Sequence, residues 1–371
     1  MFLSKNKCFC QDCHKIFDAA DAVYVGTDHD LQTSVQFRLE GRTPVLLDQT
    51  HYRLENQNQR APRNRGVVDF MELEVFDVEQ SRKLSLVAGA GSRQCPDCKA
   101  ELHPLMGTGD SYLIALVGPV RVGKTSISQS ILTTQVQREL EKILGCRIMS
   151  HTTQFRIESE ATMEGTLDIK HCFQLQKGRR LVNIFLADVA GETFSTSRDS
   201  CAQSAFQLRY AKILKKHCDG LLLLYDIRDT VFGKEKQNTA EKKMSAINPL
   251  LCSLGKRIPI ACVLTKADLF RDTMLKRGRK TMMAQDLPVL TVNSPMFEEF
   301  DHENATQAMS EHMAIARDVI TAFVKTDINV KPDTACFVVS AGRKTDQLTI
   351  DLQKQRNVLL PVLWMLRQLV L

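Results

Sequence analysis

The sequence has no apolar run long enough to cross a bilayer, which takes about 20 consecutive apolar residues. The nearest candidate is the C-terminal segment 358–371, but Pro361 and Arg367 interrupt it, so we expect a buried closing helix there. The first eight residues lack the apolar core of a secretory signal peptide. These absences predict a cytoplasmic chain that has no membrane partner.

Glycine and proline are not enriched, and the chain has no internal repeat or low-complexity segment. The net charge of +6 is diffuse and does not identify a nucleic-acid-binding protein. A polar, arginine-bearing segment at 53–66 contains no aromatic residue on which bases could stack. A solvated loop is therefore the better interpretation of this segment, with nucleic acid or an acidic partner as the alternative.

The twelve cysteines fall into two groups. Five gather before residue 100, and the others stand singly later in the chain, several of them in apolar stretches where plain core thiols are expected. These single cysteines are Cys146, Cys172, Cys201, Cys218, Cys252, Cys262 and Cys336.

Four of the clustered cysteines form two Cys-x-x-Cys knuckles, and this spacing lets two thiolates bind one tetrahedral Zn²⁺. In a reducing compartment such pairs indicate a metal site before a disulfide. We therefore expect one Zn²⁺ held by Cys10, Cys13, Cys95 and Cys98. A redox dithiol is the alternative. Three further residues are alternative ligands or, as the better interpretation, bystanders: Cys8, His14 and His103.

The long gap between the knuckles predicts an inserted subdomain, residues 15–94, whose ends the metal would join. Alternating apolar and polar residues at 31–39 and 67–76 predict strands, so the insert is expected to be rich in β-structure. The length of the chain calls for a second domain. We therefore divide the chain into a zinc-knuckle domain, 1–107, and a larger domain, 108–371.

The most specific motif follows an apolar strand at 112–117 and reads Gly-Pro-Val-Arg-Val-Gly-Lys-Thr-Ser. This is the G-x-x-x-x-G-K-[ST] pattern of a phosphate-binding loop, and a helical pattern follows it, as the motif requires. Its backbone N–H groups wrap around a phosphate chain. Lys124 is expected to reach the β- and γ-phosphates, and the Thr125 hydroxyl to bind Mg²⁺. The expected nucleotide contacts are Gly118, Arg121, Val122, Gly123, Lys124, Thr125 and Ser126.

A second apolar run, 181–187, ends at Asp188, and Gly191 follows. An aspartate at the carboxyl end of a buried strand can hold Mg²⁺ through a water, because Mg²⁺ keeps several waters when it binds to proteins. The N–H of Gly191 is placed to bind a γ-phosphate.

A third apolar run, 258–264, precedes Thr265-Lys266-Ala267-Asp268. The Asp268 carboxylate can accept two hydrogen bonds from the edge of guanine, whereas adenine offers no such pair of donors. The stem of Lys266 would lie against the ring. Further on, a backbone N–H of Ser340-Ala341-Gly342 can read the guanine oxygen.

These four motifs, in this order, make residues 111–371 resemble a Ras-like P-loop GTPase of the translation-factor-related class. The arrangement also resembles the double-GTPase proteins attributed to bacterial conflict systems. The resemblance implies an α/β fold, with helices on both faces of a mainly parallel sheet and the nucleotide at the carboxyl ends of its strands. It also implies binding of GTP with Mg²⁺, and hydrolysis of GTP to GDP.

The resemblance further implies a switch I threonine that binds Mg²⁺ and senses the γ-phosphate. Thr166 is favoured because it precedes a strand pattern that turns at Lys177-Gly178 into the next strand. The other candidates are Thr152, Thr153 and Thr162.

Two residues depart from the Ras-like pattern. Glu192 stands where these enzymes carry a water-positioning glutamine, and its charge beside the γ-phosphate would raise the barrier to hydrolysis unless it is neutralised. Arg121 lies inside the phosphate loop, at the place where guanylate-binding proteins carry an arginine finger that acts when two domains meet. Arg121 is therefore either such a finger or an exposed residue paired with an acid.

Three functions fit these residues. The leading one is a switch that binds and hydrolyses GTP and couples its nucleotide state to a protein partner or a second copy of itself, in bacterial defence. The alternatives are a GTP-binding scaffold with negligible hydrolysis and a GTPase that acts on RNA or ribosomes. Within the insertion at 269–303, the basic stretch 271–280 is an exposed element able to recruit a partner, but its sequence identifies none.

Overall fold

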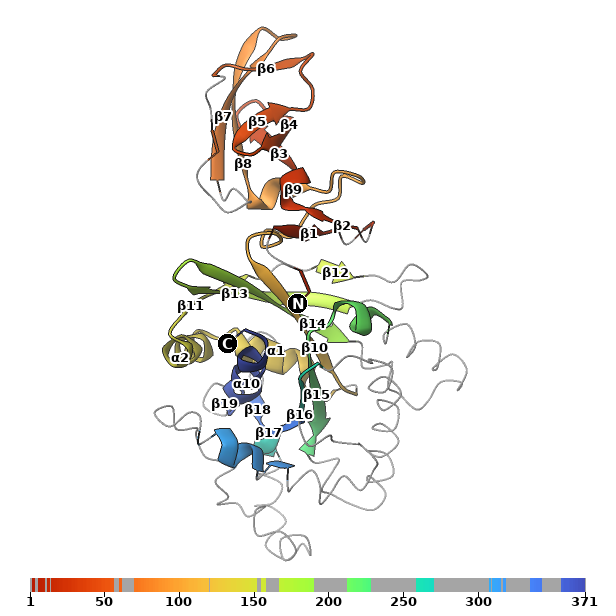
Figure 1. The fold of residues 1–371 in the computed structure, drawn as a ribbon, viewed down its shortest axis with the longest axis vertical. Helices are drawn as coiled ribbons and strands as arrows, with labels where there is room; N and C mark the ends of the chain where they lie inside the picture. Colours follow the sequence, from red (N-terminus) through yellow and green to blue (C-terminus); the bar gives the residue numbers. More distant parts are fainter. Residues whose placement is uncertain are drawn as a thin grey trace, which may run out of the picture. The chain divides into compact units, whose positions relative to one another are not determined.

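Figure 1 shows the computed structural model of the chain. It describes residues 2–3, 6–10, 12–13, 15–56, 60–61, 70–119, 121–151, 155–157, 167–189, 212–227, 258–269, 307, 309–314, 316–317, 334–341 and 355–370. The chain forms two compact units. The first comprises Met1–Ser111 with the short segments Phe155–Glu158 and Arg179–Asn183, and the second comprises the remainder.

The first unit begins with an antiparallel hairpin, β1 (Lys7–Phe9) and β2 (Ile16–Asp18), whose loop carries the first knuckle. The second knuckle follows β9 (Arg93–Gln94), where Gln94 pairs with Glu101 across the turn. Both knuckles are therefore turns between short extended segments, a geometry that brings two cysteines of each turn to one side.

An antiparallel sheet lies between the knuckles, as expected for the insert. Its strand order is β5-β4-β3-β8-β7-β6, with β9 paired to β3. Alternate side chains point into one apolar core that includes Phe37, Leu73 and Leu86, while Glu72 and Glu74 point outward. The elements are η1 (Ala19–Asp21), β3 (Val23–Asp28), β4 (Thr33–Glu40), β5 (Thr43–Leu46), β6 (Tyr52–Leu54), β7 (Phe70–Asp77), β8 (Arg82–Gly89) and η2 (Ala90–Ser92).

The second unit is built on a sheet with the order β11-β13-β14-β10-β15-β16-β17. β10 and β15 to β17 pair in parallel, whereas β11 and β13 are antiparallel. The strands are β10 (Asp110–Val117), β11 (Arg147–His151), β13 (Leu167–Lys177), β14 (Arg180–Val189), β15 (Gly220–Asp226), β16 (Ile260–Thr265) and β17 (Ala335–Val338). The short strand β12 (Phe155–Ile157) belongs to the first unit. A separate two-stranded ladder joins β18 (Ser340–Ala341) and β19 (Gln355–Arg356).

The central strands of this sheet are almost continuously apolar, and every residue of β15 is buried. Such strands belong to parallel sheets that are covered on both faces. β10 lies between β14 and β15, so the chain leaves β10 at the point where the strand order reverses. In open α/β sheets, ligands bind at that point. The predicted α/β class is therefore confirmed.

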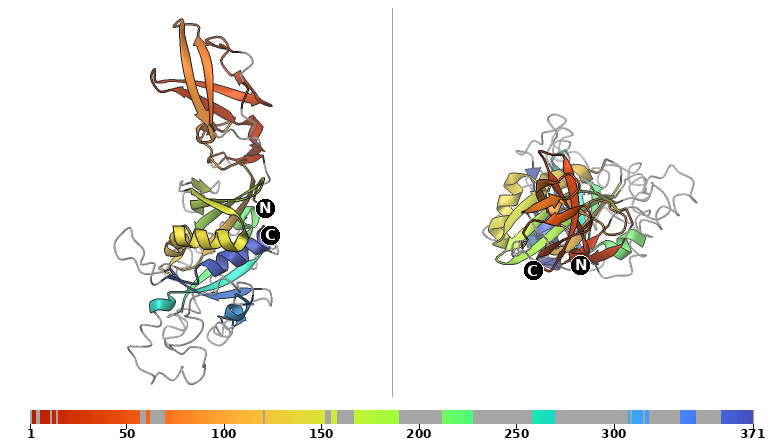
Figure 2. Two further views of the ribbon diagram at one scale, coloured as in Figure 1. Left: turned by 90° about the vertical axis from the view of Figure 1, so that its left-hand side faces the viewer. Right: turned by 90° about the horizontal axis from the view of Figure 1, so that it is seen from above.

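Three helices of this unit are described in full: α1 (Lys124–Ile131), α2 (Thr134–Leu144) and α10 (Leu359–Leu369). Figure 2 shows α2 and α10 side by side. α10 packs on the sheet so closely that a Cβ on Gly220 would lie 2.4 Å from the Met365 sulfur. The expected closing helix is thus confirmed. The prediction that helices cover both faces stays a prediction, because most of the chain between β14 and β17 lies outside the described residues. None of the helices in the described ranges is long and apolar enough to cross a membrane.

A buried histidine supports the edge strand of the sheet. His312 Nε2 accepts the Val338 N–H over 3.0 Å, and its ring stacks on Phe337. Burial lowers the pKa of His312 to about 4. In the unfolded chain this histidine titrates near its ordinary pKa of about 6.5, so the unfolded state binds the extra proton between these values. The stability that the neutral histidine contributes is therefore present above about pH 6.5 and is lost as the pH falls towards 4.

We expect His312→Gln to remove this part of the pH dependence, because its amide oxygen can still accept the Val338 N–H but does not titrate. The measurement is urea unfolding of both proteins at pH 7.5 and at pH 5. The difference between the proteins isolates the histidine, since both carry the same cysteines and carboxylates. Identical losses of stability on acidification would contradict the prediction.

Candidate nucleotide site and candidate metal centre

The phosphate loop connects β10 to α1 and closes around the ammonium group of Lys124. The Lys124 side chain is buried, and its Nζ donates to the carbonyl oxygens of Gly118 (2.8 Å) and Pro119 (3.1 Å). A Cβ on Gly118 would lie 2.5 Å from the Leu224 carbonyl oxygen, so only glycine fits there. Gly123 has φ +100° at the start of α1, a conformation that glycine adopts without strain. The residues of the motif thus have the local geometry that a phosphate-binding loop needs.

The two candidate Mg²⁺ ligands lie together. Thr125 Oγ1 is 3.4 Å from Asp188 Oδ2, although one residue is the second of α1 and the other lies near the end of β14. A hydroxyl and a carboxylate at this separation suit a hard cation that takes one ligand directly and the other through water. Ser126 is half-buried in the first turn of the same helix.

Thr265, the last residue of β16, and the following Lys266 both bind backbone carbonyl oxygens of the phosphate loop. Thr265 Oγ1 lies 2.6 Å from the Val122 carbonyl oxygen and 3.0 Å from that of Tyr225. Lys266 Nζ donates to the Arg121 carbonyl oxygen, so two successive loop carbonyls are held by two successive residues. The backbone of Arg121 has φ +62°, and its side chain is exposed.

The candidate base-reading residues are also brought together. Ser340 Oγ donates to Asp268 Oδ1 over 2.8 Å, which fixes the orientation of the carboxylate. The Ala341 carbonyl oxygen accepts a hydrogen bond from Ser130 Oγ of α1 over 2.9 Å. The loops after β16 and β17 are therefore tied to each other and to the helix that follows the phosphate loop.

Four of the predicted site residues lie outside the described residues, and their roles stay predictions: Thr166, Gly191, Glu192 and Gly342. The same holds for the other switch I candidates, Thr152, Thr153 and Thr162.

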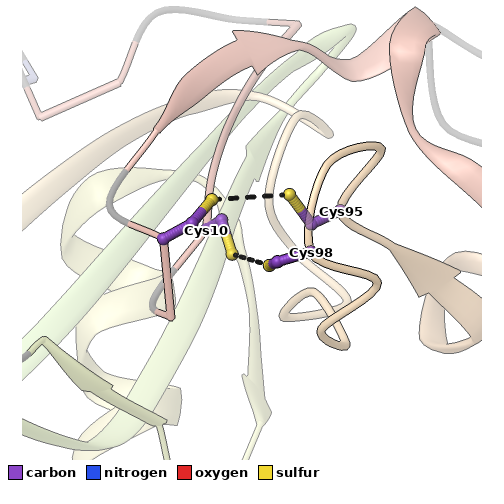
Figure 3. Close-up of side chains that lie close together, drawn as sticks. Cys10, Cys95 and Cys98 are labelled. Atoms are coloured by element: carbon purple, nitrogen blue, oxygen red, sulfur yellow. Dashed lines mark hydrogen bonds between the residues drawn. The ribbon is translucent and has the colours of Figure 1, made fainter.

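The four knuckle cysteines meet in the first unit. Their sulfur atoms all lie within 4.8 Å of one another, with 3.4 Å between Cys10 and Cys98 and 3.7 Å between Cys13 and Cys95. Figure 3 shows Cys10, Cys95 and Cys98 pointing toward one another from the two turns. Sulfur atoms around a tetrahedral Zn²⁺ with bonds of about 2.3 Å are about 3.8 Å apart. A disulfide needs about 2.05 Å, so these side chains fit a metal centre.

The four neighbouring thiols can lose their protons together only if a cation balances the negative charge of the thiolates. Burial raises the pKa of Cys10 and of Cys95, whereas the N–H of Ala100 lowers the pKa of Cys98. Zinc binding must therefore displace protons, and its affinity falls as the solution becomes acidic. A salt bridge of 3.0 Å between Lys15 and Asp97 joins the rims of the two turns.

The other candidate ligands have different contacts. Cys8 is fully buried, and its sulfur lies 3.6 Å from Arg93 Nη1. The Nδ1 of His103 accepts the N–H of Leu105 over 3.2 Å. His14 lies outside the described residues.

Residues 133–319, just over half of the chain, match the family model described as Double-GTPase 2. The chain belongs to the Double-GTPase 2 family. The matched region contains Asp188 and Thr265 to Asp268, but not the phosphate loop. The phosphate-loop motif at 118–126 therefore supports nucleotide binding independently of the family match.

Two solved structures are similar to parts of this chain. The cytosolic domain of the T. maritima FeoB iron transporter, in a GDP form, is 16% identical, with a TM-score of 0.25 over 44% of this chain and 48% of that one. A mutation variant of SsGBP is 15% identical, with a TM-score of 0.31 over 70% of this chain and 55% of that one. This chain thus covers about half the length of each. Comparison with curated proteins gives no match.

One residue of the site, Asp226, was missed by the sequence motifs. It is the last residue of β15, 8% exposed, and its Oδ2 accepts a hydrogen bond of 2.7 Å from Lys266 Nζ. The only signal in the sequence is a charged residue that ends an otherwise apolar strand. Because the parallel register places Asp226 opposite Thr265, the carboxylate lies beside the lysine that holds the phosphate loop in this Double-GTPase 2 protein.

We expect Asp226→Asn to speed GDP release by about tenfold, because the Lys266 ammonium loses an ionised partner and holds the Arg121 carbonyl less firmly. The rate is measured by displacing a fluorescent GDP analogue with excess GDP. Asp219→Asn is the matched control: Asp219 is as buried, lies just before β15 and accepts the Leu113 N–H over 3.0 Å. Equal rates in the two variants would show that Asp226 has no particular role at the nucleotide site.

Proposed function

We propose that this protein binds GTP and GDP with Mg²⁺ and hydrolyses GTP as a molecular switch. The observation that carries the proposal is that Lys266 binds the Arg121 carbonyl oxygen of the phosphate loop while Asp268, two residues further on, accepts a hydrogen bond from Ser340. A candidate base-reading carboxylate and a candidate phosphate site then share one set of strand ends. Membership of the Double-GTPase 2 family supports guanine nucleotide as the ligand.

In this proposal Lys124 exchanges its carbonyl contacts for the β- and γ-phosphates. Thr125 and Asp188, which lie 3.4 Å apart, would hold Mg²⁺, and the metal would supply charge that stabilises the transferring phosphoryl group. Thr166 completes the metal site, and Glu192 orients the attacking water. Asp268 and the backbone of Ser340-Ala341-Gly342 select guanine.

The switch acts on a protein partner or on a second copy of the chain, in bacterial defence and in the cytoplasm. The resemblance to the double-GTPase proteins supports the role in defence. Neither nucleic acid nor a membrane is part of the proposal. A Zn²⁺ bound by Cys10, Cys13, Cys95 and Cys98 joins the ends of the inserted sheet and stabilises the first unit.

Arg121 is proposed to supply the positive charge that the γ-phosphate needs during hydrolysis and that the negatively charged Glu192 cannot supply. A non-glycine residue at φ +62° costs on the order of 1 kcal/mol, and such strain is usually kept where function requires it. The exposed guanidinium is available to a γ-phosphate across an interface. We expect the rate of GTP turnover per molecule to rise with protein concentration or with an activator, and Arg121→Ala to abolish that rise, because arginine fingers contribute about 10³–10⁵ in rate.

The measurement is phosphate release at saturating GTP across a dilution series of both proteins. GTP affinity serves as the control, since Arg121→Ala keeps the backbone carbonyl that Lys266 binds. A flat specific activity that the substitution leaves unchanged would favour a GTP-binding scaffold instead.

A further inference from the structure

Arg93 is an arginine with no exposed surface, located between the two knuckle turns. Its Nε donates to the Ala90 carbonyl oxygen over 3.0 Å. Its Nη2 donates to the carbonyl oxygens of His103 (3.2 Å) and Pro104 (2.9 Å), and its Nη1 contacts the Cys8 sulfur. The guanidinium therefore connects the hairpin of the first knuckle to the chain on both sides of the second.

These contacts give each nitrogen of the guanidinium an acceptor but leave its charge unbalanced. All its oxygen acceptors are neutral carbonyls, and in the described part of the chain no carboxylate forms an ion pair with Arg93. A buried charge is costly unless a charge of opposite sign lies near it. The fold thus needs an anion close to Arg93.

The cysteine cluster can supply that anion. Four thiolates around Zn²⁺ carry a net charge of −2. Arg93 lies two residues before Cys95, and its contact Cys8 lies two residues before Cys10. Side chains two residues apart on an extended strand lie on the same side of it, and their Cα atoms are about 6.5 Å apart. Opposite charges on such neighbouring side chains attract each other far more strongly in poorly hydrated protein than in water.

Two disulfides formed from the same four cysteines would be neutral and would leave Arg93 without a counter-charge. We infer that Arg93 is the built-in counter-charge of a zinc tetrathiolate, and that it acts as a positioning residue that holds the two knuckles together for the metal. This inference rests on the proposed zinc site and adds a residue that is not a ligand.

The test uses the full-length protein loaded with zinc and follows metal release to a chromogenic chelator. Arg93→Met keeps the length of the side chain and removes the charge. We expect it to release zinc about tenfold faster than wild type or more, as is typical when groups outside the ligand set are lost. Arg93→Lys keeps the charge with fewer hydrogen bonds and is expected to lie closer to wild type than to Arg93→Met.

Arg82→Met is the matched control, because Arg82 lies in the inserted sheet, pairs with Asp77 and donates to Thr33. It should release zinc at the wild-type rate. Equal release from Arg93→Met and wild type would overturn the role of Arg93 while leaving the zinc site intact. Equal release from Arg93→Lys and Arg93→Met, with both faster than wild type, would overturn the counter-charge. A wild-type protein without zinc would overturn both proposals.

Discussion

Asp268→Asn is expected to weaken GDP binding by about a hundredfold or more and to create affinity for xanthosine diphosphate. Ser340 Oγ donates to Asp268 Oδ1, and the carbonyl oxygen of an asparagine can still accept that bond. The amide NH₂ then occupies the place of Oδ2, where it faces the N–H donors of guanine. Two opposed donors leave buried polar groups unpaired, which is the condition under which sites discriminate most strongly.

Xanthine carries a carbonyl where guanine carries its amino group, so it can accept from the new NH₂. Competition binding with both diphosphates, on wild type and on Asp268→Asn, gives the two affinities. The gain for xanthosine diphosphate is the internal control, because a misfolded variant would lose both ligands. Unchanged guanine affinity in the variant would exclude Asp268 from the site.

The second large effect is expected for the metal centre. Purified protein should contain about one Zn²⁺ per chain, and Cys95→Ser should lose it, because a site with four sulfur ligands contributes folding free energy directly. Residues 1–107 are expected to become protease-sensitive in the variant while GDP binding is largely retained. The readouts are zinc content, limited proteolysis and nucleotide affinity.

Cys8→Ser is the matched control for this experiment. Cys8 is as buried as Cys95 and lies close to the same turns, but it is not part of the four-sulfur cluster. It should keep its zinc. A wild-type protein that is stably folded without metal would contradict the zinc proposal.

The sequence was sufficient to predict features fixed by short-range chemistry. The glycines of the phosphate loop are needed by local geometry, as the close approach of Gly118 to Leu224 illustrates. The spacing within each knuckle likewise fixed which cysteines meet, and the alternation at 31–39 and 67–76 gave strands β4 and β7. Each of these signals is contained within a few residues of the chain.

Features that depend on long-range register were not predictable. Asp226 contacts Lys266 only because β15 and β16 pair in a particular register. No pattern in the sequence around Asp226 predicts this contact. Arg93 was missed for a different reason: arginines are almost always exposed, so a fully buried one cannot be inferred from its own segment. The strand order of the inserted sheet also arises from pairing between distant segments.

Competition between GDP and ADP for the wild-type protein, in the presence of Mg²⁺, tests guanine-nucleotide binding at the ends of β10, β16 and β17 most directly. Because the Asp268 carboxylate is expected to accept hydrogen bonds from donors that adenine lacks, GDP should bind at least about tenfold more tightly than ADP. Equal affinities for the two nucleotides would contradict it.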